Sequence, residues 1–238
     1  MIKEIARQIY EELKKENGTI KAILKEIEKE KTAKLHMTKT PFLNSIGNEF
    51  GKLLLREEEK FEMLLKLWKI GKRDERLIVI AALGRISEHD YEWTKKFVLG
   101  ILEDISDWEI CDQLALKAIV NLVIKNQEEM FSMMEKWIKA ENKWIRRLAI
   151  ATIPPYIRAR PQNAEMCLEF LNDAMQDEDK DVKKAIGWAL REISKKDSKA
   201  VFEFLMKWAK VENMRWIVKE GMKKLPKEEK EKLVALMG

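Results

Sequence analysis

The sequence predicts an all-α protein built as a solenoid, that is, a row of antiparallel helix pairs. Three observations support this prediction. The 238 residues include only 9 Gly and 5 Pro beside 37% charged residues, which is typical of long charged helices and too poor in turn formers for a many-stranded β protein. Apolar residues recur at spacings of three and four, and a small residue recurs at a nearly constant interval.

The N-terminal region, residues 1–60, is expected to be helical but less regular than the rest. Apolar positions at helical spacing predict helices over residues 2–13 and 20–27. In residues 38–51, Pro41 and two glycines interrupt the pattern. We therefore expect a loop beside a short helix in that segment.

A repeat begins after residue 60, where residues 61–68 predict a helix. Small residues in register mark the helices that follow: Ala81, Ala115, Ala149, Gly187 and Gly221. Their intervals of 34, 34, 38 and 34 residues each accommodate two helices and two short turns, which predicts a HEAT-like α-solenoid of about five helix pairs. Eight residues before each small residue is a polar residue expected near the start of the second helix of a pair: Arg73, Asp107, Glu141, Asp179 and Asn213.

Charge and linker composition predict one domain with a basic face. No segment rich in Gly, Ser or Pro divides the chain, so we expect residues 1–238 to form a single domain. In a curved solenoid the second helices line the concave face. The net charge of +5 is C-terminal, and between Glu141 and Arg160 five cations accompany one acid. We expect a concave basic face that is able to neutralise phosphates, although a basic run more often forms a solvated helix surface, so charge alone does not decide its role.

Several classes of protein are excluded by what the sequence lacks. The longest apolar run, residues 77–83, is far short of the ~20 residues of a membrane span, and the N-terminus lacks a secretory core. Cys111 and Cys167 cannot form a disulfide framework, which favours a reducing cytoplasmic location. His36 and His89 have no second ligand at metal spacing. We therefore expect no metal and no other cofactor.

The segment DWEICD is the most informative in the chain. It places Trp108 and Asp112 four residues apart, on one face of a helix. One repeat later KWIRR presents Arg146 and Arg147, and one further repeat presents Trp188 in AIGWALRE. For any one of these residues, a structural role in an Asp–Arg ladder or in the core is the more common explanation.

The segments WEICD, KWIRRLAI and AIGWALRE, in this order and spacing, resemble the signature segments of the bacterial and archaeal DNA alkylation repair glycosylases of the AlkD type. The match is strongest over residues 105–195. In that family a Trp and an Asp of one helix, an Arg of the next repeat and a later Trp form the cleft for a damaged nucleotide. The matching positions here are Trp108, Asp112, Arg147 and Trp188. Residues 37–47 are only loosely similar to the family, so its lesion-covering aromatic helix has no assigned counterpart.

This resemblance implies a DNA glycosylase that excises cationic N3- or N7-alkylated purines by hydrolysing the N-glycosidic bond. Such a purine is already positively charged, so it can leave without a general acid. The transition state is positive at the sugar, as in other glycoside cleavages. Asp112 would stabilise this charge and orient the attacking water, and Trp108 and Trp188 would attract a cationic sugar or base through their ring faces.

The same resemblance implies contacts to the DNA backbone. Arg147 would hold the phosphate beside the lesion, supported by Arg146, Lys143 and Lys184. We expect a monomer that binds alkylated double-stranded DNA at the nucleoid and does not bind a membrane. Two alternatives remain open: a non-catalytic HEAT-like DNA-binding protein of the same family, and a protein-interaction scaffold.

Overall fold

The computed structural model describes residues 1–15, 20–28 and 39–238, and over these residues it contains helices and no β-strand. The described residues gather into two compact units. Unit 1 comprises Met1–Leu102 and Lys117–Lys125, and unit 2 comprises Glu103–Leu116 and Asn126–Gly238. The single domain expected from the sequence stays a prediction. None of the helices described is long and apolar enough to span a membrane.

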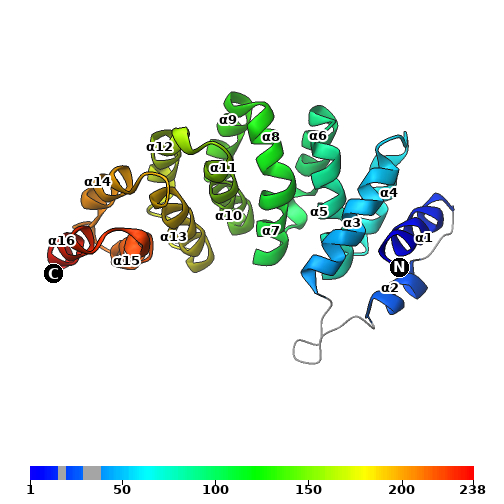
Figure 1. Cartoon of the computed structure of the whole chain (residues 1–238), viewed down its shortest axis with the longest axis horizontal. Coiled ribbons are helices and arrows are strands. Elements are labelled where there is room, and N and C mark those ends of the chain that lie inside the picture. Colours follow the sequence, from blue (N-terminus) through cyan, green and yellow to red (C-terminus); the bar gives the residue numbers. More distant parts are fainter. Residues whose placement is uncertain (16–19, 29–38) are drawn as a thin grey trace. The chain divides into compact units, whose positions relative to one another are not determined.

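Unit 1 is built around two helices that pack side by side, α3 and α5 (Figure 1). The helices of this unit are α1 (Ile2–Lys14), α2 (Lys21–Glu28), α3 (Thr40–Leu54), α4 (Lys60–Lys69), α5 (Arg73–Ser87), α6 (Tyr91–Ile101) and α8 (Val120–Lys125). Helix α1 packs on α3, and α8 packs on α5 and α6. The helices predicted over residues 2–13, 20–27 and 61–68 are confirmed as α1, α2 and α4.

The loop expected over residues 38–51 was wrong for the part that the structure describes, because Thr40–Leu54 is one helix of 15 residues. Pro41 lies in its first turn, where a missing N–H costs nothing. Gly47 is buried against α5, where an added Cβ would lie 2.4 Å from the carbonyl oxygen of Ile78. The glycine therefore allows two backbones to approach closely, and it does not end the helix. Thr38 lies outside the described residues.

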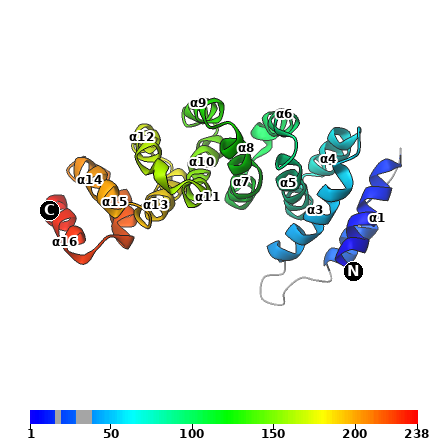
Figure 2. The same ribbon diagram turned by 45° about the horizontal axis from the view of Figure 1, so that its top comes forward.

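Unit 2 consists of two rows of helices (Figures 1 and 2). Its helices are α7 (Trp108–Leu114), α9 (Gln127–Trp137), α10 (Lys143–Ala151), α11 (Ile153–Ala159), α12 (Ala164–Ala174), α13 (Lys180–Ser194), α14 (Ser198–Trp208), α15 (Arg215–Gly221) and α16 (Lys227–Met237). Single 3-10 turns cover Leu102–Asp104, Pro161–Asn163 and Met222–Lys224. Helices α7, α10, α13 and α15 pack in succession in one row, and α9, α12 and α14 lie in the other. This arrangement confirms the predicted all-α solenoid of antiparallel helix pairs.

All five small residues of the predicted repeat register are buried, as close packing of the helices requires. The polar positions behave in two ways. Asp107 and Asp179 cap α7 and α13 by accepting backbone N–H groups of the first turn. Arg73 instead begins α5, and Glu141 lies one residue before Asn142, which caps α10. The expected position of the second helices is therefore correct to within about a residue.

A π-helical turn, which the sequence did not predict, joins α7 to α8. It spans Ala115–Ile119, so Trp108–Lys125 is one continuous helix with an altered turn at its middle. A π turn holds one more residue than an α turn and changes the direction in which the preceding side chains point. The face of α7 therefore cannot be extrapolated from α8 at 3.6 residues per turn.

Candidate functional site

The predicted site residues all lie in unit 2, on the adjacent helices α7, α10 and α13. The Asp107 side chain accepts the N–H groups of Glu109 and Ile110, at 2.9 and 3.0 Å, and so fixes the start of α7. Asp179 fixes the start of α13 in the same way, with the N–H of Asp181 at 2.7 Å. Because both helices begin at defined residues, the side chains of their first turns occupy defined places.

Asp112 and Arg147 form a two-pronged ion pair between α7 and α10. Arg147 donates from Nε to Oδ1 of Asp112 at 2.9 Å and from Nη2 to Oδ2 at 2.7 Å. The side chains of Asp112 and Arg147 are 14% and 7% exposed, respectively. Arg147 also donates from Nη1 to the main-chain carbonyl of Asp181. The guanidinium therefore connects three successive helices of unit 2.

Burial and the ion pair have opposite effects on the Asp112 carboxyl. Burial, the larger effect, raises the pKa of Asp112 above its ordinary value, and the hydrogen bond and charge of Arg147 oppose it. Burial also raises the pKa of the neighbouring Cys111 thiol well above its usual value. Cys111 is fully buried, with Sγ 3.5 Å from the carbonyl of Trp144.

The two predicted indoles differ in exposure. Trp108, the first residue of α7, is 59% exposed, although large aromatic side chains usually lie mostly inside a protein. Trp188 is half-buried on α13. In the described part of the chain, neither indole has a stacked-ring or cation–π partner. Trp108 is thus an exposed aromatic surface one helical turn from Asp112.

Lys143 and Lys184 converge on one carboxylate, Asp181. The distances from Nζ to the nearer carboxylate oxygen are 3.0 Å for Lys143 and 3.3 Å for Lys184. Lys143 also lies 3.4 Å from Asp179 and above the ring of Trp144, at 4.6 Å from its centroid. The structure therefore brings these two predicted DNA-binding lysines together through an acid that the sequence analysis did not single out.

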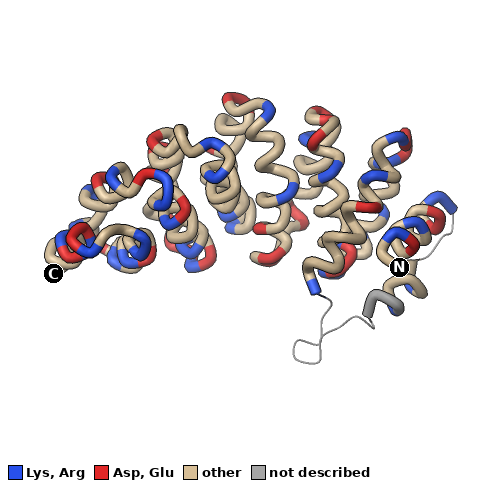
Figure 3. The backbone as a smooth tube through the Cα atoms, in the orientation of Figure 1, with Lys and Arg blue, Asp and Glu red and all other residues tan. Residues whose placement is uncertain are grey.

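Two other cations of the predicted basic cluster are paired in the same manner. Arg146 bonds Asp177 at 2.6 Å, and Arg158 bonds Glu192 at 3.0 Å. Basic and acidic residues are interspersed along the described helices (Figure 3). The acids are distant in sequence but adjacent in the repeat, because one repeat advances the chain by 34 or 38 residues. A search for opposite charges about one repeat apart, at offsets of 31 to 38 residues, would have found them.

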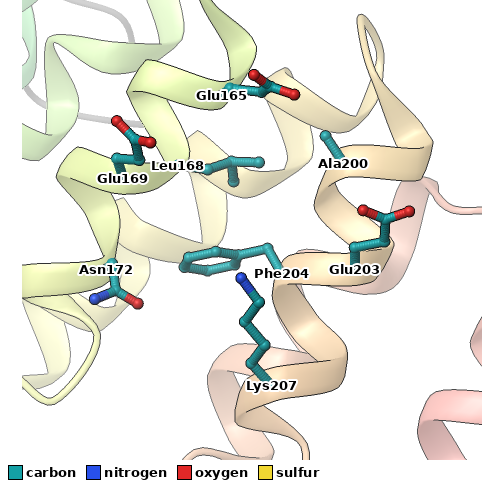
Figure 4. Close-up of a pocket in the computed structure, with 8 residues that line it drawn as sticks. All are labelled: Glu165, Leu168, Glu169, Asn172, Ala200, Glu203, Phe204 and Lys207. Carbon is teal, nitrogen blue, oxygen red and sulfur yellow. The ribbon is translucent and has the colours of Figure 1, made fainter.

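Two open clefts of unit 2 contain none of the predicted site residues. One cleft, of about 450 Å³, lies between α12 and α14. There Leu168 and Phe204 point toward one another, and Glu165, Glu169 and Glu203 lie at the rim (Figure 4). A second cleft, of about 490 Å³, lies at residues 176–183 and 211–214. We give both less weight than the α7–α10–α13 face, because that face, unlike either cleft, holds a mostly buried, paired carboxylate beside an exposed indole.

Metal binding has no candidate among the residues described. They contain no group of three or more His, Cys, Asp or Glu side chains arranged to hold an ion. His36, one of the two histidines considered in the sequence analysis, lies outside the described residues.

Comparisons with known proteins give a family and a fold. The sequence matches the family described as "DNA alkylation repair enzyme" over residues 11–225. The structure is similar to that of smu.31 from Streptococcus mutans UA159, with a TM-score of 0.53, 19% identity and coverage of 95% of this chain and 100% of that one. It is also similar to AlkD2 from Streptococcus mutans, with a TM-score of 0.52, 18% identity and coverage of 94% and 99%. No curated protein matches. At these identities the structural likeness shows a shared fold.

Proposed function

The chain belongs to the DNA alkylation repair enzyme family, and from this premise we propose that it is a DNA glycosylase that releases cationic N3- or N7-alkylated purines from duplex DNA. The observation that carries the proposal is the Asp112–Arg147 ion pair, buried between α7 and α10 one turn from the exposed Trp108. A carboxylate held in this manner provides fixed negative charge beside an aromatic surface.

The proposed reaction is hydrolysis at the sugar C1′. The C1′–N bond breaks, and its electron pair neutralises the alkylated purine, which leaves as a neutral base. A water oxygen bonds to C1′ and releases a proton to solvent. Positive charge develops on the sugar before water attacks, so an ionised Asp112 stabilises the transition state more than the ground state. Trp108 and Trp188 would add attraction between their ring faces and the cation.

Arg147 would have two roles in this proposal. It orients Asp112 through two hydrogen bonds, and a guanidinium carries five N–H groups. Three of them are used in the hydrogen bonds to Asp112 and Asp181, and we propose that the exposed edge of the guanidinium, 7% of the side chain, reaches a phosphate oxygen beside the lesion. Lys143, Lys184 and Arg146 would hold neighbouring phosphates.

We further propose that the protein acts as a monomer on chromosomal DNA in the cytoplasm, with neither metal nor cofactor. The second candidate is a non-catalytic DNA-binding protein of this family. Its support is the tight engagement of Arg147 by Asp112, which is also what a structural ion-pair ladder between repeats requires. A protein-interaction scaffold is the third candidate, because four of the five cations of the predicted basic cluster have carboxylate partners.

Incubation with methylated duplex DNA, followed by chromatography of the released bases, separates these candidates. The proposed enzyme releases 7-methylguanine or 3-methyladenine above the spontaneous rate. Salt-dependent duplex binding without base release would identify the non-catalytic binder. If the protein shows neither base release nor salt-dependent duplex binding, the protein-interaction scaffold is the remaining candidate.

A further inference from the structure

Asp181 occupies an unusual position among the residues proposed to hold DNA. Its carboxylate accepts Nζ of Lys143 at 3.0 Å through one oxygen and Nζ of Lys184 at 3.3 Å through the other. Lys143 comes from the preceding helix of the row, α10, and Lys184 from the next turn of α13. One acid therefore binds two of the cations that the proposed function assigns to phosphates.

The side chain of Asp181 does not hold Arg147. Arg147 donates to the main-chain carbonyl of residue 181, which any residue at this position provides. The N-terminus of α13 is likewise capped by the carboxylate of Asp179, and Asp181 contributes only its N–H. A change of the Asp181 side chain therefore leaves both the Asp112–Arg147 pair and the helix cap with their partners.

We propose that Asp181 attenuates DNA binding, because its carboxylate competes with DNA phosphates for Lys143 and Lys184. This inference rests on the proposed function, which places a duplex on the α7–α10–α13 face. The two lysines are accessible to a phosphate, since their side chains are 35% and 58% exposed. A phosphate that binds them shares their ammonium groups with Asp181, whose negative charge then lies close to the negatively charged DNA backbone.

This competition predicts the direction in which DNA affinity changes when Asp181 is substituted. Most residues beside a binding face strengthen binding or leave it unchanged, and their substitution weakens the complex. Removal of the Asp181 charge should strengthen it. Lys184 would lose its carboxylate partner, whereas Lys143 would keep the more distant Asp179 at 3.4 Å. We therefore expect about one additional phosphate contact, and not two.

The test is the affinity of Asp181→Asn for an undamaged duplex across a series of salt concentrations. We expect binding about 3- to 10-fold tighter than wild type near 0.1 M salt, with the slope of log K against log salt steeper by about one. In a variant that also carries Lys143→Gln and Lys184→Gln, the added Asp181→Asn change should give no gain in affinity. Circular dichroism verifies that each variant is folded, and Asp181→Ser replaces the Asn variant if that one is not.

Glu169→Gln is the matched control for net charge. Glu169 is an exposed carboxylate on α12, at the rim of the cleft between α12 and α14 (Figure 4). Its substitution by Gln also removes one negative charge from unit 2, but does so away from the proposed DNA face. Equal affinities of the Asp181→Asn and Glu169→Gln variants would overturn the inference and leave the proposed function intact. Wild-type protein that shows no salt-dependent duplex binding would overturn the proposed function itself.

Discussion

At the residue scale, the Asp112–Arg147 pair contributes to both the proposed chemistry and the stability of unit 2. Asp112→Asn keeps the shape of the side chain and removes its charge. We expect base release to fall by roughly 10²-fold or more, the effect of losing one preorganised electrostatic contact. The melting temperature should also fall, because Asn offers Arg147 one acceptor oxygen where Asp112 offers two. Duplex affinity should survive.

Asp177→Asn is the control for this prediction. Asp177 bonds Arg146 at 2.6 Å, so it also pairs with a cation of the preceding repeat in the same unit, but it has no proposed part in catalysis. Its loss should lower the melting temperature and leave base release per folded molecule unchanged. If the two Asn variants lose activity only in proportion to their unfolded fractions, Asp112 is structural.

The sequence predicted the positions on α7, α10 and α13 better than it predicted their partners. Trp108 and Asp112 follow from helical spacing, and Arg147 from the family resemblance. Asp177 and Asp181 were missed because each lies in a different run of the sequence from its cation, Arg146 or Lys143, 31 or 38 residues away. Those runs lie in separate helices that only the stacking of unit 2 brings together. Exposure of Trp108 depends equally on packing.

At the element scale, the close approach of α3 and α5 depends on Gly47. In Gly47→Ala the new Cβ would meet the carbonyl oxygen of Ile78 at 2.4 Å and the Cβ of Ala81 at 2.5 Å. Overpacking of this kind costs about 1–3 kcal/mol, which exceeds the gain of up to about 1 kcal/mol from the helix propensity of Ala. We expect a lower melting temperature.

Gly100→Ala provides the opposite case within unit 1. Gly100 lies in α6, and a Cβ added there would have no atom within 4 Å, so only the propensity gain applies. Its melting temperature should rise by a few degrees, since about 1 kcal/mol corresponds to about 2–4 °C at this size. Equal shifts of the two variants would refute the packing argument.

Helical periodicity identified most elements correctly because their buried faces are continuous. It was wrong at α3 because a glycine read alone resembles a helix breaker, and its packing against α5 is visible only in three dimensions. The π turn at Ala115–Ile119 was missed because its residues are ordinary helix formers. No composition signal marks an inserted residue within such a helix.

At the scale of the whole molecule, ion pairs between repeats predict sensitivity to acid. The hydrogen bond from Lys143 holds the pKa of Asp181 below its ordinary value, and burial opposes this effect. Burial would raise the pKa of Glu192, but the hydrogen bonds from Lys195 and Arg158 outweigh burial, so the pKa of Glu192 is also lowered. A carboxyl with a lowered folded-state pKa stabilises the fold above its unfolded-state pKa, and this contribution is lost as pH falls.

The pH dependence of the Asp112 contribution has the opposite sign. Burial raises the pKa of Asp112, so its contribution to the stability of the fold is lost as pH rises. The carboxyls with lowered pKa values act together. We therefore expect the melting temperature to fall as pH decreases from about 5 toward 3, because the pKa values of Asp and Glu in the unfolded chain are near 4. Thermal unfolding followed by circular dichroism at each pH measures this. A melting temperature that is constant over that range would contradict the prediction.

The burial of the two cysteines matters in the chemical environment of such a repair protein, where methylating agents are present. Methylating electrophiles react with thiolates as well as with purines, and only the ionised thiol is strongly nucleophilic. Cys111 and Cys167 are both fully buried. Burial raises the pKa of Cys167 to about 12 and that of Cys111 well above the usual range. The folded protein therefore offers no reactive thiolate at neutral pH to the agents that would create its proposed substrate.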